Sequence, residues 1–309
     1  MHLPNRAAAP LAIAAAVLAA LPCARGQEDR AVFRSETRLV LLHATVADKN
    51  GKLVTNLGRG AFKVYENNVE QELRMFRRED VPVSMALVID NSGSMRDKRQ
   101  RVEAAALALV KASNPQDEVM VVNFNDEAYE DVPFTSDVKR MEEGLTRIDS
   151  RGGTAMRDAL SMTLDRVKER ARKDKKVLLI ITDGNDNTSA ITLEKLVQKA
   201  HESEIVQYAI GLLSEEERRE AKRAQRALDT LTSATGGLAY YPKQTTAVEE
   251  LAVQVAHEIR NQYILAYTPK NQALDGSFRQ VRVAVSGPNR PTARTRTGYY
   301  ATPEPSRRR

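Results

Sequence analysis

The sequence has a single cysteine, Cys23, among its 309 residues. We expect the N-terminal segment that contains it to be removed, so the mature chain would carry no thiol. An exported chain of this kind has no disulfide bonds and must be held by its core and by any metal that it binds. Lipid attachment to Cys23 is disfavoured, because Pro22 stands where a small residue is wanted before a lipidated cysteine.

Long apolar runs are lacking after the first 26 residues. The run from Leu11 to Leu21 is itself too short to span a bilayer as a helix. Arg6 precedes this run and Ala24-Arg25-Gly26 follows it, as in a secretory signal with its cleavage site. We therefore predict a cleaved signal peptide over residues 1–26, with an uncleaved N-terminal anchor as the alternative. The product is expected to be soluble, with no transmembrane segment, and to be secreted or held in the periplasm or cell envelope.

Acidic residues are slightly outnumbered, with 41 Asp and Glu against 47 Lys and Arg and a net charge of +6. The excess gathers near the C-terminus and ends in Arg307-Arg308-Arg309. No interleaved aromatic residues and no nucleic-acid-binding motif accompany these arginines. We interpret residues 303–309 as a solvated basic tail and predict no nucleic-acid partner.

Short-period patterns at both ends of the chain are typical of antiparallel β structure. Leu39 to Val46 is rich in β-forming residues, Asn50-Gly51 is a hairpin signal, and Val281, Val283 and Val285 alternate with polar residues near the other end. Neither end has enough strands for a core of its own. We predict that residues 27–80 and 263–302 pair into one small β-sandwich-like domain, with the middle of the chain inserted between them.

From residue 81 to residue 262, strand-length apolar runs alternate with helix-length segments. The expected strands are Ser84–Ile89, Glu118–Phe124, Val177–Ile181, Ile205–Ile210 and Leu238–Tyr241. The expected helices are Arg99–Ala112, Val138–Ile148, Ala155–Arg172, Leu193–Glu202, a charged helix opened by a capping box at Ser214–Glu217, and Glu249–Arg260. This alternation predicts an α/β fold, a doubly wound and mostly parallel sheet with helices on both faces.

Three short segments at the ends of these apolar runs carry oxygen donors. They are Asp90-Asn91-Ser92-Gly93-Ser94, Gly152-Gly153-Thr154 and Thr182-Asp183-Gly184. Ligands bind beyond the carboxyl ends of the strands in open parallel sheets, so we expect these segments to meet at one edge. Each segment alone has an ordinary explanation, as a helix cap or a turn. Together they predict one metal site made by five side chains: Asp90, Ser92, Ser94, Thr154 and Asp183.

The donor set consists of oxygen atoms, with no His or Cys, and this favours a hard cation. Mg²⁺ or Mn²⁺ suits it better than Zn²⁺. If hydroxyl groups bind directly and carboxylates act through water, the cation keeps much of its positive charge. Such a cation would attract a carboxylate presented by a protein partner.

The same three segments resemble the metal-ion-dependent adhesion site of von Willebrand factor type A domains. The resemblance covers about residues 81–262 and has no departure at the five positions, and the flanks resemble those of secreted bacterial proteins built around such a domain. It implies a Rossmann-like fold and a metal-dependent adhesion or protein-binding module. In that family the first loop supplies Asp90, Ser92 and Ser94, the second Thr154, and the third Asp183.

Two other functions remain open. A metal-dependent phosphoryl-transfer hydrolase would need a base beside Ser92, and His43, His201 and His257 fall in stretches with no evident link to the site. An assembly scaffold with a structural metal is the second alternative, and the oligomeric state is not predicted. We expect a binding module that is not an enzyme. Asn185 and Asp186 are expected to border the ligand face from their loop, and Asp158, one helical turn beyond Thr154, to lie on the helix surface or behind the ligands; none of the three is expected to bind the cation.

Overall fold

A computed structural model describes residues 38–78, 80–145, 150–184, 186–213 and 218–303, all within one unit that spans residues 37–309. Several predicted features lie outside these ranges: the signal peptide, Asn185, the capping box at Ser214–Glu217 and residues 304–309 of the basic tail. Within the described ranges, no helix combines the length and the apolar character that a membrane span requires.

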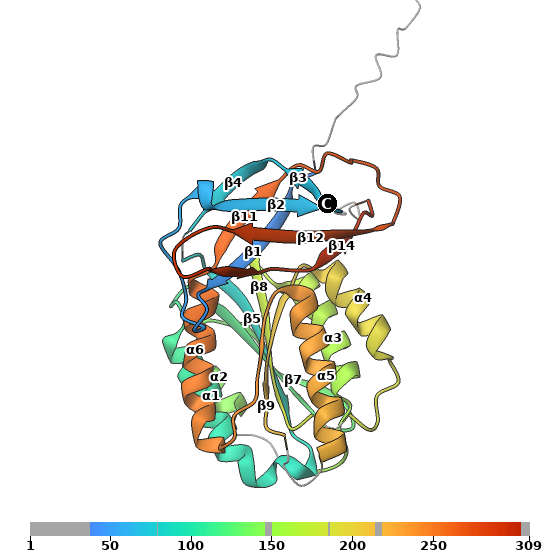
Figure 1. Ribbon diagram of the computed structural model, residues 1–309. Coiled ribbons are helices and arrows are strands. Elements are labelled where there is room, and N and C mark those ends of the chain that lie inside the picture. Colours follow the sequence, from blue (N-terminus) through green and yellow to red (C-terminus); the bar gives the residue numbers. More distant parts are fainter. Residues whose placement is uncertain (1–37, 79, 146–149, 185, 214–217, 304–309) are drawn as a thin grey trace, which may run out of the picture. The chain divides into compact units, whose positions relative to one another are not determined.

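The middle of the chain forms a six-stranded sheet of order β10-β9-β8-β5-β6-β7 (Figure 1). Its strands are β5 (Val83–Asp90), β6 (Glu118–Phe124), β7 (Ala128–Thr135), β8 (Lys175–Thr182), β9 (Val206–Gly211) and β10 (Ala239–Tyr240). All neighbours are parallel except β6 and β7, which are antiparallel. The chain winds outward from β5 on one side through β6 and then on the other side through β8, β9 and β10. The predicted doubly wound, mostly parallel sheet is confirmed.

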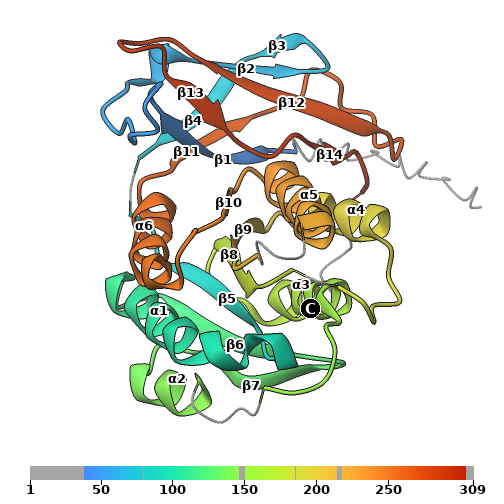
Figure 2. The same ribbon diagram turned by 60° about the horizontal axis from the view of Figure 1, so that its bottom comes forward.

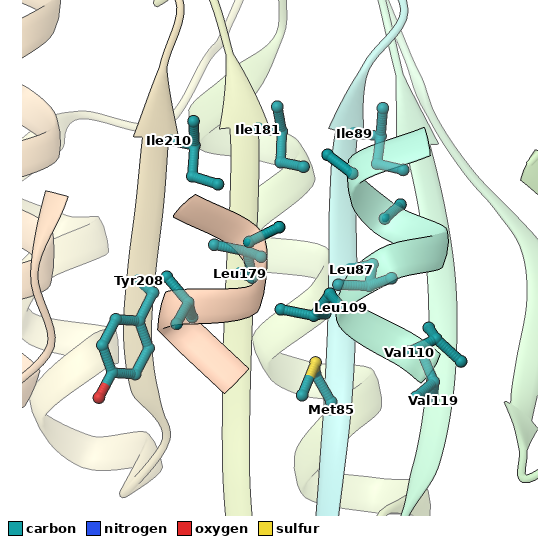
Figure 3. Close-up of a cluster of buried hydrophobic side chains, with 14 of the residues drawn as sticks. Met85, Leu87, Ile89, Leu109, Val110, Val119, Leu179, Ile181, Tyr208 and Ile210 are labelled. Atoms are coloured by element: carbon teal, nitrogen blue, oxygen red, sulfur yellow. The ribbon is translucent and has the colours of Figure 1, made fainter. Parts of the chain in front are cut away.

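Helices cover both faces of this sheet (Figure 2). They are α1 (Arg99–Ala112), α2 (Val138–Leu145), α3 (Met156–Arg170), α4 (Leu193–Ser203), α5 (Arg218–Thr235) and α6 (Val248–Arg260). Alternate residues of a strand point to opposite faces. Met85, Leu87 and Ile89 accordingly pack with α1, α2 and α6 (Figure 3), whereas Ala86 and Val88 pack with α3, α4 and α5. All eight residues of β5 are therefore buried, including Asp90 at its carboxyl end.

The two flanks of the chain build a pair of four-stranded sheets. One has the order β13-β1-β11-β4 and the other β14-β12-β2-β3. The strands are β1 (Val40–Ala47), β2 (Phe62–Glu66), β3 (Val69–Gln71), β4 (Leu73–Arg77), β11 (Tyr263–Tyr267), β12 (Phe278–Val285), β13 (Thr292–Arg294) and β14 (Gly298–Tyr300). Each sheet mixes strands from both flanks, and one cluster joins their cores, including Leu42, Val64, Tyr263 and Val283. The predicted pairing of the flanks is confirmed, while the exact domain boundaries stay a prediction.

Short 3-10 helices complete the described elements: η1 (Arg59–Ala61), η2 (Gly93–Lys98) and η3 (Thr245–Ala247). Of these, η2 matters for the site, because it follows β5 directly and carries Ser94 and Lys98.

Candidate functional site

The candidate site lies where the sheet changes its direction of winding. Asp90 is the last residue of β5, and Asp183 directly follows β8. These two strands are parallel neighbours, with Ile89 paired to Ile181. Both loops therefore leave the sheet at the same edge, which is where ligands bind in folds of this kind.

Asp90 lies beneath the site and is fully buried. Its Oδ1 accepts a hydrogen bond from the backbone N–H of Ser92 at 2.9 Å, and its Oδ2 accepts one from the Thr182 hydroxyl at 2.6 Å. Burial, reinforced by the charge of Asp183, raises the pKa of Asp90 to about 6. A positive charge held above Asp90 would favour its ionised form.

The other four predicted residues line one pocket of about 450 Å³. They are Ser92, Ser94, Thr154 and Asp183, and the pocket is completed by Lys98, Gly152, Gly153, Asn187, Glu220 and Ala221. The hydroxyl oxygens of Ser92 and Ser94 lie 3.1 Å apart. The structure thus brings all five predicted side chains to one place, four at the pocket wall and Asp90 behind them.

The loop that carries Thr154 is held by side chains from two other loops. The N–H of Gly153 donates to Asp126 Oδ1 at 2.8 Å, and the N–H of Thr154 donates to Asn187 Oδ1 at 2.9 Å. Helix α3 begins at Met156, its N-cap residue is Ala155, and the N–H groups of Arg157 and Asp158 in its first turn donate to the side chains of Asp186 and Ser189. The Thr154 hydroxyl therefore does not serve as the helix cap that the sequence also allowed, and it lines the pocket instead.

Lys98 contacts the second carboxylate of the site. Its Nζ donates to Asp183 Oδ2 at 3.2 Å and to the carbonyl oxygen of Leu212 at 3.3 Å. The other carboxylate oxygen, Asp183 Oδ1, is buried and has no hydrogen-bond partner in the described part of the chain. A buried carboxylate oxygen without a partner costs free energy unless a cation or water satisfies it.

Asp158 and Asp186 lie beside the site and hold its loops together. Asp158 accepts hydrogen bonds from the backbone N–H groups of Ala190 and Ile191, at 2.8 and 2.9 Å. Asp186 forms a salt bridge with Arg157 at 3.0 Å. Both carboxylates are engaged in these contacts, and neither lines the pocket.

Four residues that contribute to the site were not among the predicted ones: Lys98, Asp126, Thr182 and Asn187. Thr182 and Asp126 stand at or just beyond strand ends, so the same strand-end reasoning could have included them. Lys98 reaches the pocket from the end of η2 and Asn187 from the loop after β8, and no short motif reveals either position.

The chemistry of the donors fits a hard divalent cation. Among the described residues there is no group of three or more His, Cys, Asp and Glu side chains placed to hold a metal. The site offers two carboxylates together with three hydroxyl groups, a set that suits Mg²⁺ or Mn²⁺ and not a thiophilic metal. The partnerless Asp183 Oδ1 is consistent with a ligand at this point.

Comparison with known proteins identifies the class of the central domain. Residues 85–185 match the family described as von Willebrand factor type A domain, so the chain contains a domain of this family. Comparison with curated proteins gives no significant match.

Several solved structures are similar in fold. The conserved hypothetical protein BatB from Bacteroides thetaiotaomicron is 16% identical, with 57% of this chain and 98% of that chain covered and a TM-score of 0.47. The PilB minor pilin from Streptococcus sanguinis is 14% identical, with 59% and 62% covered and a TM-score of 0.48. A von Willebrand factor type A protein from Catenulispora acidiphila is 15% identical, with 87% and 74% covered and a TM-score of 0.49.

Proposed function

We propose that this chain is an exported protein-binding module that grips an acidic group of its partner through a divalent cation. The residues that would hold the cation are Asp90, Ser92, Ser94, Thr154 and Asp183, and the cation would be Mg²⁺ or Mn²⁺. The observation that carries this proposal is the convergence of four of these side chains on one pocket, with the buried Asp90 behind them.

The arrangement of charge explains why such a site would bind a partner. The pocket wall offers hydroxyl groups, which are neutral, and one of the two carboxylates is set back from it. A cation held by this set keeps part of its charge and can accept one more oxygen ligand from outside. A carboxylate on a partner protein is the matching ligand.

The pocket is better suited to binding than to catalysis. A nucleophilic serine needs a nearby base. The Ser92 hydroxyl pairs with that of Ser94, and the described pocket lining contains no His. His43 and His201 line a different cavity, and His257 lines a third. These positions support a non-enzymatic role over a phosphoryl-transfer hydrolase.

Calorimetric titration with Mg²⁺ and Mn²⁺ tests the proposal. The unaltered protein should bind one cation, and Ser94→Ala and Asp183→Ala should each weaken binding at least tenfold. Ser277→Ala is the matched control, because Ser277 is exposed and bonds to Asp275 away from the pocket. No saturable binding by the unaltered protein, or equal binding by all four proteins, would overturn the proposal.

Export and assembly need separate measurements. The signal peptide predicted over residues 1–26 gives an exported product that begins at Gln27, and mass determination of the mature protein tests this; retention of residues 1–26 would contradict it. Light scattering with and without a chelator distinguishes adhesion from assembly. Loss of partner binding without a change in mass supports adhesion, whereas dissociation of an oligomer supports the scaffold alternative.

A further inference from the structure

A groove between α4 and α5 adjoins the metal pocket. Both views show these helices side by side (Figures 1 and 2), and the groove between them has a volume of about 550 Å³. Glu220 lines the groove and the metal pocket, and Gly184 of the groove directly follows Asp183. A chain segment that leaves the metal pocket at this point can continue into the groove.

The groove has an excess of positive charge. Arg157 and Asp186 line it but pair with each other. The remaining charged lining residues are four cations, all exposed on α5, and two carboxylates: Arg219, Lys222, Arg223, Arg226, Glu194 and Glu220. Clefts lined by an excess of one charge concentrate ligands of the opposite charge. An acidic segment is therefore the matching occupant.

The far end of the groove opens into a second, apolar hollow of about 410 Å³. The two share Leu193, Glu194 and Thr230. Phe278 lines this hollow with 40% of its surface exposed, and its ring lies edge-on to those of His201 and Tyr300, at centroid distances of 4.9 and 5.2 Å. An exposed aromatic ring in a hollow is the kind of site that anchors an apolar side chain.

The length of the groove sets the length of its occupant. From Arg219 to Thr230, α5 advances by about 17 Å at 1.5 Å per residue. About five residues of extended chain cover that distance. With one or two further residues at each end, a segment of about seven to nine residues reaches from the metal pocket to Phe278.

We propose that these three hollows form one track for a linear acidic segment of a partner protein. One carboxylate of the segment would occupy the metal pocket, acidic residues would follow the α5 cations, and an aromatic or aliphatic side chain would insert beside Phe278. This proposal rests on the proposed metal-dependent function, and it adds a prediction of the kind of sequence that the partner segment carries. A folded partner without such a segment would contact only the metal face.

Selection from a library of random 12-residue peptides, carried out on the full protein in Mg²⁺, tests the track. The enriched peptides should be rich in Asp and Glu and should carry an aromatic or aliphatic residue near one end. Enrichment without acidic residues would overturn the proposal. A labelled copy of the most enriched peptide then serves as the probe for fluorescence anisotropy with variants.

The double variant Arg223→Gln/Arg226→Gln should weaken binding of that peptide at least tenfold, and Phe278→Ala at least fivefold. Neither should change the Mg²⁺ titration. Lys139→Gln/Arg140→Gln on α2 is the matched control, since it removes two exposed cations from the helix layer of the opposite sheet face. Equal affinity of the groove variant and this control would overturn the proposal, as would equal competition by a single-stranded oligonucleotide.

Failure of the track and failure of the metal site give different results. If Mg²⁺ binds normally but the affinity for the peptide does not depend on Arg223 and Arg226, the proposed track is wrong and the metal proposal stands. If no cation binds while the peptide still depends on these arginines in chelator, the metal proposal is wrong and the groove is an acidic-peptide site in its own right.

Discussion

Lys98 lies against the carboxylate of Asp183, with its ammonium nitrogen 3.2 Å from Oδ2. Both side chains line the pocket that would hold the cation. A dication that enters this pocket is repelled by the ammonium group and competes with it for the same carboxylate. Lys98→Met should therefore tighten Mg²⁺ binding, by about three- to tenfold in view of the partial exposure of the pair.

Calorimetric titration of Lys98→Met checks this expectation. Lys199→Met is the control, because Lys199 also pairs with an aspartate, Asp165, but lies on α4 outside the pocket. Weaker binding by Lys98→Met would show that the lysine supports the site and does not compete with the cation.

Gly152 is required by the loop that carries Thr154. Its φ is +76°, and a Cβ atom there would lie 2.2 Å from Asp126 Oδ2, which belongs to the carboxylate that holds this loop. Gly152→Ala should weaken Mg²⁺ binding at least fivefold and lower the free energy of unfolding by about 1 to 2 kcal/mol.

Gly51→Ala provides the matched control for this substitution. Gly51 has a φ of +80° with open space around it, so its replacement brings the same backbone strain without a clash. It should leave Mg²⁺ binding unchanged. If both variants lose Mg²⁺ binding, the cause is a general loss of stability and not a displacement of the loop that carries Thr154.

Glu258 joins the two parts of the fold. Its buried carboxylate on α6 accepts hydrogen bonds from Thr45 of β1 and from Tyr208 and Tyr240 of the central sheet, and it forms a salt bridge with Arg294 of β13. Glu258→Gln removes the charge that these donors share. We expect the free energy of unfolding to fall by about 2 to 3 kcal/mol.

Chemical denaturation measures this loss. Glu249→Gln is the control, because Glu249 is exposed in the first turn of the same helix, and it should change stability by less than about 0.5 kcal/mol. An equal effect of the two substitutions would contradict the role assigned to Glu258.

His43 makes stability depend on pH. Burial, together with the charges of Lys175 and Arg296, lowers the pKa of His43 from 6.5 to about 3. Between these values the unfolded chain binds a proton that the folded chain does not, so this contribution to stability falls as the pH drops from about 6.5 toward 3. The slope from one such group is at most about 1.4 kcal/mol per pH unit.

Denaturation of the unaltered protein and of His43→Gln at several pH values isolates that contribution. Asp90 also makes stability depend on pH in this range, but its contribution rises as the pH drops, because its folded pKa is raised. This contribution is the same in both proteins and therefore cancels when the two are compared. The substituted protein should lose less stability at low pH. Parallel curves of unfolding free energy against pH for the two proteins would contradict the expectation.

Regular periodicity made most of the fold predictable. The bounds of α1 and β6 match the predicted segments, because their apolar patterns are continuous and end at clear turn residues. Strand β7 was missed: it is antiparallel, polar and interrupted by Pro133, as an edge strand can be. The short strands β4 and β13 were missed as well.

The particular strand partners across distant segments could not be predicted. Asn50-Gly51 does form a turn, with the Gly51 N–H bonded to the Asp48 carbonyl at 2.9 Å. The hairpin around it is a single bridge between Ala47 and Leu53, because β1 pairs instead with β11 and β13. At the site, the five donors could be predicted from strand ends, whereas the position of Lys98 depends on the course of η2.

The most direct test of the central claim is a crystal structure with Mn²⁺, measured for anomalous scattering. The account predicts one anomalous peak within bonding distance of the hydroxyl oxygens of Ser92, Ser94 and Thr154, on the pocket side of Asp90 and Asp183. A fully soaked crystal with no peak in this pocket, or with its only strong peak elsewhere on the protein, would contradict it.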